Sequence, residues 1–389
     1  MNRFKTSKDN QRGVNLIELM VAITIGLILS GGVMSLFVSN RTTYSISEQL
    51  ARVQENARFA IDAMARDIRM AGFMGCNNDI EQVFKGTTIT PAAGDLWDTD
   101  FVIEGHDDAM GATWSPSGFA TPGALVAGTD GITVRFLDGK LITPVIASGS
   151  GSLTAAENAD VNINDEIFDF YNSPNGHSVF GVGHCGRTDI LTVTAMNQDV
   201  DVDGSEDLFY AAGSIQGGYS GTLDQDDPEG NAMVAPVRAV RYYVGTGAWG
   251  GPSLFRQILT GGPAATDQEL IEGVENMQLL YGLDNVTPAD GAADAYADAD
   301  AANLDNEGEW GRVMSVRIGL LLRTVSTAQA DGTYGNVADT STYNLFTGQK
   351  GCAVPADVGC VDPADLNLKR RVFTTTVTLR NQRVKPGRF

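Results

Sequence analysis

The sequence predicts an α+β fold, in which a long N-terminal helix packs on an antiparallel β-sheet head with large loop insertions. Three observations predict this fold. Residues 19–38 carry no charged side chain, and residues 46–68 repeat apolar side chains at spacings of three and four. From residue 72 onward, short runs of β-branched and aromatic residues alternate with glycine-rich turns. The first two observations predict a continuous helix, and the third predicts strands.

The composition argues against a nucleic-acid partner. The chain has 48 acidic residues against 27 lysines and arginines, which gives a formal net charge of −21. A field of this sign repels phosphate backbones. Of the 389 residues, about 310 remain after the helix, which is enough for one large domain or two small ones. We therefore expect a sizeable core and no nucleic acid.

Residues 14–38 are predicted to form a membrane-crossing half of the helix. At about 1.5 Å per residue, the uncharged stretch is long enough to span a bilayer. Four basic residues and one acid precede it, so this end should stay in the cytoplasm while the remainder is exported. An ordinary secretory signal has a shorter apolar core. A plain membrane anchor fits the length, yet it leaves unexplained why Glu18 stands at the edge of the segment, where a charge is costly.

The residues around Glu18 resemble the class III signal of type IV prepilins. Gly13 is followed by Val14, Glu18 is the fifth residue after the glycine, and the long uncharged stretch comes next. The resemblance implies that prepilin peptidase cleaves between Gly13 and Val14, which makes residues 1–13 a leader peptide, and that the new amine is methylated. Most relatives carry Phe where this chain has Val14. The resemblance also implies that Glu18 offsets the N-terminal amine of a neighbouring subunit during assembly.

Residues 39–70 are predicted to be an amphipathic continuation of this helix. The apolar stripe consists of Ile46, Leu50, Val53, Ala57, Ile61, Met64 and Ile68. The polar residues expected on the other faces are Arg52, Glu55, Arg58, Asp62, Arg66 and Asp67. A helix from Val14 to about Met70 would be roughly 85 Å long, and its stripe should face an exported head of residues 71–389. Gly31 and Gly32 mark either a place where the helix unwinds or a close helix contact.

Seven runs of the head predict strands: 131–137, 189–195, 237–244, 254–259, 276–283, 313–322 and 372–379. The last run alternates Phe373, Thr375, Val377 and Leu379 with more polar residues, which is the period of a half-buried antiparallel strand.

Residues 273–284, 310–324 and 370–381 resemble the PilW family of minor pilins, which is also similar to the J kind of type II secretion minor pseudopilins. This resemblance implies a pilin-like architecture. It further implies a low-abundance pilus component that joins other minor pilins and the major pilin, starts assembly, and sits at the pilus tip, often beneath a large adhesin. The head would lie in the periplasm, anchored in the inner membrane, until assembly. A J-like pseudopilin is the alternative, and an enzyme or adhesin merely tethered by a helix is a third class.

Four cysteines, Cys76, Cys185, Cys352 and Cys360, all lie on the expected exported side, where disulfides persist. Three pairings are possible. We favour Cys352 with Cys360, which closes a short loop containing proline and glycine, and Cys76 with Cys185. Free buried thiols are the alternative.

The tract DVDVDGSED at residues 199–207 predicts a possible Ca²⁺ loop. Asp199, Asp201, Asp203 and Asp207, with Gly204 at the sharp turn, match the spacing of oxygen ligands in such loops. Tyr210 stands where an EF-hand has a bidentate Glu, so an EF-hand proper is excluded. An outside carboxylate would have to complete the site, and the candidates are Asp224, Asp226 and Asp227. The alternative is a solvated acidic hairpin turn.

Two further segments have an unusual charge composition, and the chain has three histidines. Residues 290–309 are rich in Ala and Asp and predict a flexible surface loop. The last 21 residues hold seven basic residues and no acid, which predicts a strand with solvated charges or a docking face for an acidic neighbour. No catalytic motif is present. His184 beside Cys185 suggests a Cys/His pair, but a disulfide through Cys185 would disable it, so we expect no enzyme.

Overall fold

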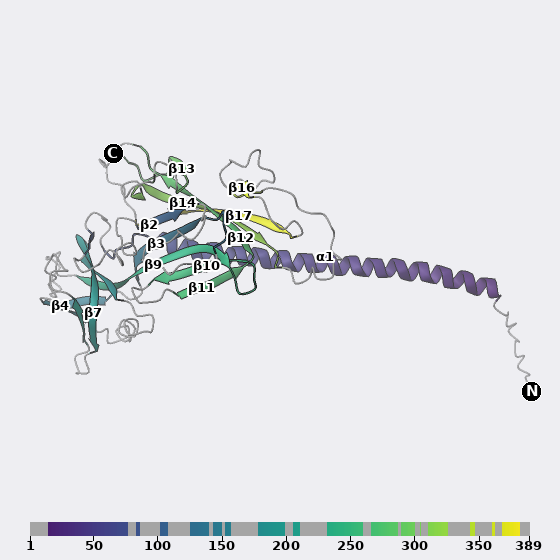
Figure 1. Cartoon of the computed structure of the whole chain (residues 1–389), viewed down its shortest axis with the longest axis horizontal. Coiled ribbons are helices and arrows are strands. Elements are labelled where there is room, and N and C mark those ends of the chain that lie inside the picture. The colour runs from purple at the N-terminus through teal and green to yellow at the C-terminus, as the bar shows by residue number, and fades with distance from the viewer. Residues whose placement is uncertain are drawn as a thin grey trace, which may run out of the picture. The chain divides into compact units, whose positions relative to one another are not determined.

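The computed structural model describes residues 15–76, 83–85, 102–107, 125–139, 143–149, 152–156, 178–198, 205–210, 232–259, 266–286, 289–299, 304, 310–325, 343–346, 360–361 and 368–381. These residues form helix α1 and strands β1 to β17 (Figure 1). The chain divides into two units, residues 1–52 with 327–335 and residues 53–326 with 336–389.

Helix α1 (Leu16–Met70) contributes to both units. In the first unit, residues 15–41 are exposed, and the next charged residue after Glu18 is Arg41. In the second unit, α1 buries the stripe that starts at Val53 and continues through Ala57, Met64 and Ile68. The helix stops where Gly72 adopts a φ of 74°, a left-handed conformation that glycine reaches without steric cost. The observed long helix and mostly antiparallel strands confirm the predicted α+β fold.

The larger sheet of the second unit is centred on β9 (Met233–Thr246), which pairs with β3, β4, β6 and β10. Its other strands are β1 (Val83–Lys85), β2 (Ile103–His106), β3 (Gly131–Leu137), β4 (Thr143–Gly149), β5 (Ser152–Ala156), β6 (Val179–His184), β7 (Arg187–Gln198), β8 (Ser205–Tyr210), β10 (Pro252–Leu259) and β11 (Thr266–Glu272). All of its pairings are antiparallel except β1 with β7.

The smaller sheet has the order β13-β12-β14-β17, with β12 (Val274–Leu283), β13 (Ala295–Ala297), β14 (Val313–Arg323) and β17 (Arg370–Thr378). Strands β15 (Tyr343–Asn344) and β16 (Cys360–Val361) pair separately. In β17, Val377 is buried while Thr374, Thr376 and Thr378 are exposed, as the alternation of the sequence predicts. All seven predicted runs are strands, although Leu379 falls just beyond β17.

A single apolar core joins α1 to both sheets. It includes Ala60 and Met64 of α1, Val240 of β9 and Ile318 of β14. The contact is close where the sheets meet: a Cβ at Gly105 of β2 would lie 2.2 Å from the hydroxyl oxygen of Tyr281 in β12. Glycine is therefore required there. Burial raises the pKa of Tyr281 well above its usual value.

Two sequence predictions about charged segments were wrong. Part of the acidic tract, predicted as a flexible loop, forms β13 and pairs with β12. The turn between these strands is ordered by Asp284, which is fully buried and accepts a hydrogen bond from the Gly291 amide at 2.7 Å. Arg370, predicted as a solvated charge, is also buried, and its Nη2 donates to Oε1 of Glu275 at 3.0 Å.

Asp67 was also predicted wrongly, as a residue of the polar face of α1. It is buried, and its Oδ2 accepts a hydrogen bond from the Tyr242 hydroxyl at 2.6 Å. The same oxygen lies 2.8 Å from Nη2 of Arg256. Strands β9 and β10 thus hold the last turns of α1 through one carboxylate. Burial, followed by the charge of Asp67, raises the pKa of Tyr242.

Replacing Asp67 by alanine should lower the free energy of unfolding by about 2–4 kcal/mol, because the Tyr242 hydroxyl would stay buried, and the Arg256 guanidinium partly buried, without their acceptor. Urea unfolding of the full chain in detergent measures this loss. Asp62→Ala is the matched control: Asp62 lies on the same helix with a side chain 67% exposed, 3.9 Å from Arg58. It should change stability by no more than about 0.5 kcal/mol. Equal losses in the two variants would contradict the assignment.

Candidate functional site

The first half of α1 presents an exposed apolar surface with one carboxylate at its start. Glu18 lies in the first turn of the helix. Beyond it, large apolar side chains such as Ile28 and Leu36 are 76% and 66% exposed. Contiguous apolar surface of this extent marks a site for a membrane or for other proteins. Among the described residues, α1 is the helix with the length and composition to cross a membrane.

Two threonine hydroxyl groups in this part of α1 bond to the helix itself. Thr24 donates its hydroxyl to the carbonyl of Met20 at 2.8 Å, and Thr43 donates to Ser39 at 3.0 Å. Such bonds hide hydroxyl groups from an apolar environment. A Cβ built at Gly31 or Gly32 would meet no described atom within 4 Å other than those of the adjacent helix backbone, and α1 runs through both residues without a break. The surface of this part of the helix is therefore compatible with apolar surroundings, except at Glu18.

Gly13 and Val14, the residues of the predicted cleavage site, lie outside the described residues. The first described residue is Asn15, whose carbonyl accepts a hydrogen bond from the Leu19 amide at 3.1 Å. The helical turn that contains Glu18 therefore starts two residues after Gly13.

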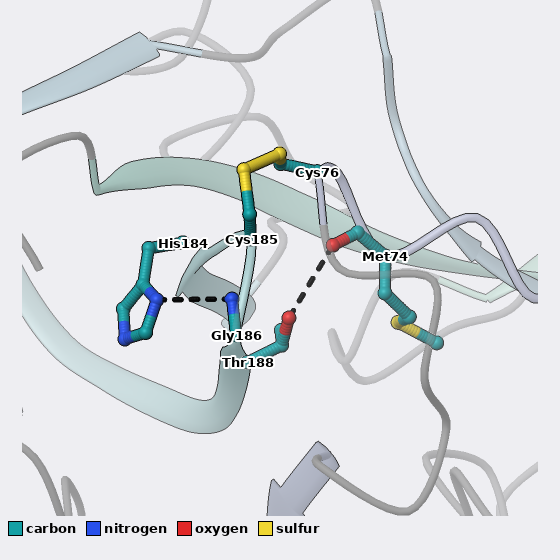
Figure 2. The surroundings of a disulfide bond; sticks show 6 residues. All are labelled: Met74, Cys76, His184, Cys185, Gly186 and Thr188. Atoms are coloured by element: carbon teal, nitrogen blue, oxygen red, sulfur yellow. Dashed lines mark hydrogen bonds between the residues drawn. A yellow bond between two sulfur atoms is a disulfide. The ribbon is translucent and has the colours of Figure 1, made fainter. Parts of the chain in front are cut away.

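A disulfide joins Cys76 to Cys185, the pairing favoured from the sequence (Figure 2). Cys76 follows the end of α1, and Cys185 lies in the turn between β6 and β7, with the two Cα atoms 4.4 Å apart. Beside the bond, the Thr188 hydroxyl donates to the Met74 carbonyl at 3.3 Å. The segment that leaves α1 is thus tied to the larger sheet by a covalent bond and a hydrogen bond.

The disulfide removes the proposed Cys/His pair, since Cys185 has no thiol to act as a nucleophile. His184 instead accepts a hydrogen bond at Nδ1 from the Gly186 amide, at 3.1 Å (Figure 2). Of the second predicted pair, Cys360 lies in β16, whereas Cys352 lies outside the described residues.

The predicted Ca²⁺ loop connects two paired strands. Asp199, Asp201 and Asp203 lie outside the described residues, between the antiparallel strands β7 and β8. Asp207 lies within β8, opposite Asn197 of β7. In the part of the chain that the structure describes, no group of three or more His, Cys, Asp or Glu side chains could hold a metal ion.

A buried polar row crosses the larger sheet, and sequence reasoning missed it. Five residues on β2, β3, β9, β10 and β11 stand opposite one another in turn: Glu104, Thr133, Arg241, Gln257 and Asp267. The three central ones are fully buried. Arg241 donates through Nη2 to Oε1 of Gln257, and Arg135 pairs with Glu104 at 2.8 Å. The only sequence signal was the presence of arginines within otherwise apolar strands.

Burial controls ionisation in this row. It lowers the pKa of Arg241 to about 10, against the raising effects of Tyr243 and Asp267. For His106, burial is again the largest cause and lowers the pKa to about 4, although Glu104 acts in the opposite direction. His106 is therefore neutral in the folded protein at ordinary pH.

Removal of the disulfide should lower the free energy of unfolding by about 2–5 kcal/mol, because the bond closes a long loop in the unfolded chain. The paired residues are 109 positions apart. The test is chemical unfolding of the double variant Cys76→Ser, Cys185→Ser. Thr188→Val is the matched control, since it removes only the adjacent hydrogen bond and should cost about 1 kcal/mol. A double variant as stable as the wild type would contradict the expectation.

Acid should destabilise the head through His106. Between its ordinary pKa of 6.5 and about 4 in the fold, the unfolded chain binds more protons, so stability is retained above pH 6.5 and falls as the pH drops toward 4. The loss is about 3 kcal/mol. His106→Gln should remove this part of the pH dependence, measured as unfolding free energy across that range. An unchanged slope in His106→Gln would refute the prediction.

Comparison with known proteins matches two parts of the chain. Residues 241–381 match the family model described as Type IV Pilus-assembly protein W, and residues 8–34 match the prokaryotic N-terminal methylation motif. No curated protein and no solved structure matches the chain. The assembly-protein match covers the end of β9, strands β10 and β11, and the smaller sheet, while the motif match covers Glu18 and the start of the exposed helix. The chain thus combines a prepilin motif at the start of an exposed apolar helix with a region that matches a pilus-assembly protein, and both matches support a PilW-type minor pilin of the type IV pilus.

Proposed function

We propose that this pilin joins other minor pilins to start assembly of the pilus and remains at its tip. Prepilin peptidase cleaves the inner-membrane precursor between Gly13 and Val14, releasing residues 1–13. Residues 14–38 then move from the membrane into the filament core, and the head of residues 71–389 lies in the periplasm until assembly. The observation that supports this best is Glu18 in the first turn of an exposed, uncharged helix.

The physical argument concerns the cost of this carboxylate. An unpaired charge in an apolar environment costs several kcal/mol, and an opposite charge within reach recovers much of that cost. The dipole of α1 contributes only about 0.3–1 kcal/mol in its first turn. The terminal amine of a neighbouring processed subunit is a suitable partner. Docking would remove a penalty that each isolated subunit carries in the membrane.

A structural role at the tip also fits the head. In the second unit, two sheets share one apolar core with the second half of α1. A head of this bulk is easier to place at the end of a filament than at every position along the shaft. The role requires no catalysis, and the cysteine beside His184 is already oxidised.

Glu18→Ala should leave membrane insertion and cleavage intact while reducing recovery in sheared pili by at least about tenfold, as expected when an interaction of more than about 1.4 kcal/mol is lost. Quantitative immunoblots of pilus and membrane fractions provide the measurement. Glu48→Ala is the control, because Glu48 lies on the same helix and pairs at 2.9 Å with Arg52 within the subunit. Wild-type incorporation of Glu18→Ala would refute the proposed role.

A deletion strain distinguishes a role in the pilus from a role in a type II secretion system. Pilus number and twitching should fall, and enzyme activity in the culture fluid should be unchanged. The reverse result would favour the J-like pseudopilin instead.

A further inference from the structure

The edge of the smaller sheet formed by β17 has the properties of a docking site. Strand β17 pairs with β14 on one side, and no described strand pairs with its other side. It is nine residues long, contains no proline, and pairs with β14 without a register shift. Proteins usually protect an edge strand by shortening it, bulging it or covering it. Strand β17 is neither shortened nor bulged.

The hydrogen-bond pattern shows which groups of β17 point outward. The Leu379 amide donates to the Met314 carbonyl at 2.9 Å, and the Thr324 amide donates to the Lys369 carbonyl at 3.0 Å. In an antiparallel pair, alternate residues direct both backbone groups to the partner strand. Odd-numbered residues of β17 therefore bond to β14. The backbone N–H and C=O groups of Val372, Thr374, Thr376 and Thr378 point away from it.

The opposite edge of this sheet is closed by the chain itself. Strand β13 pairs with residues 281–283 of β12. Next to it, the Asp130 amide donates to the Met277 carbonyl at 2.9 Å, and the Asp130 carboxylate accepts from the Leu279 amide at 2.7 Å. One edge is thus capped in the folded subunit. At the β17 edge, no described strand pairs with the outward backbone groups, although the Thr374 side chain donates its hydroxyl to the Leu345 carbonyl.

Charge indicates what kind of strand the β17 edge would accept. Lys369 and Arg371 are exposed at one end of β17, and Arg380 is exposed just beyond the other end. In the described part of the chain, no carboxylate pairs with these three side chains. The last 21 residues contain no acid at all, although the whole chain has a net charge of −21. This is a local basic surface on an acidic protein, and it favours an acidic partner.

We propose that the β17 edge binds an extended acidic segment of a neighbouring pilus subunit by β-strand addition. The backbone groups of Thr374, Thr376 and Thr378 would bond to the incoming strand, and Lys369, Arg371 and Arg380 would pair with its carboxylates. Only the assignment of the segment to a pilus subunit rests on the proposed function; the edge and its charge do not.

The first test examines the edge in the full chain in detergent micelles. Amide hydrogen exchange should be faster at Val372, Thr374, Thr376 and Thr378 than at the intervening odd-numbered residues, because only the latter bond to β14. Thr376→Pro should fold normally, since its N–H points outward, whereas Thr375→Pro should lose about 3 kcal/mol of stability. Equal exchange at odd and even positions would overturn the proposal.

The second test supplies a peptide that can pair with the β17 edge as an additional strand. The probe is a synthetic peptide of about eight alternating Glu and Val residues, long enough to cover β17. It should slow exchange at the even-numbered amides by about tenfold or more, and the same peptide with Lys in place of Glu should not. Thr376→Pro should abolish this protection, and the matched variant Thr376→Val, which keeps the N–H, should retain it.

No protection by the acidic peptide, or equal protection by the two peptides, would overturn the proposal. These outcomes are independent of pilus counts in the deletion strain, so failure of the docking edge is distinguishable from failure of the proposed pilus role. The double variant Arg371→Glu, Arg380→Glu tests the role of charge. It should weaken binding of the acidic peptide and strengthen binding of the lysine peptide.

Discussion

The head depends on the buried contact of Asp67 with Tyr242 and Arg256. Apolar contacts along the α1 stripe tolerate small shifts of the helix, because they have little directional preference. A carboxylate held by a hydroxyl and a guanidinium does not, since its hydrogen bonds require specific directions. The side-chain amide of Asn381 donates to the Arg69 carbonyl at 3.2 Å, so the chain that follows β17 reaches the same turns of the helix. Both sheets are thereby fixed to the C-terminal end of α1.

The two halves of α1 meet opposite physical requirements with the same backbone structure. From Val53 onward, one stripe is apolar and the head covers it. From Leu19 to Val38 the side chains are uncharged and exposed, and the Thr24 hydroxyl bonds back to the helix. The folded chain thus satisfies its second half internally and leaves its first half to be covered from outside. Under the proposed role, a bilayer and a filament core would be two successive solutions to this one requirement.

The sequence predicted those features that have a visible period. The α1 stripe and seven strands repeat over enough residues to be recognised. The pairing of Cys76 with Cys185 was favoured because Cys352 and Cys360 could close a short loop with each other. The buried charges could not be predicted from the sequence, because their partners are distant in the chain. Tyr242 lies 175 residues from Asp67, and Glu275 lies 95 residues from Arg370. Strands such as β4, β5 and β8 lie in a glycine-rich middle region without clear alternation. Only the fold could reveal that Arg241 stands in a buried row.

The disulfide between Cys76 and Cys185 changes how mechanical tension would travel through the subunit. A filament pulled lengthwise transmits force through its helices, and any such force on α1 reaches Cys76 six residues after the helix ends. From there the covalent bond passes it directly to the β6–β7 turn, and β6 is paired to the central strand β9. This covalent path bypasses residues 77–178, which lie between Cys76 and the start of β6. Long insertions can therefore accumulate in that span without weakening the subunit against stretching.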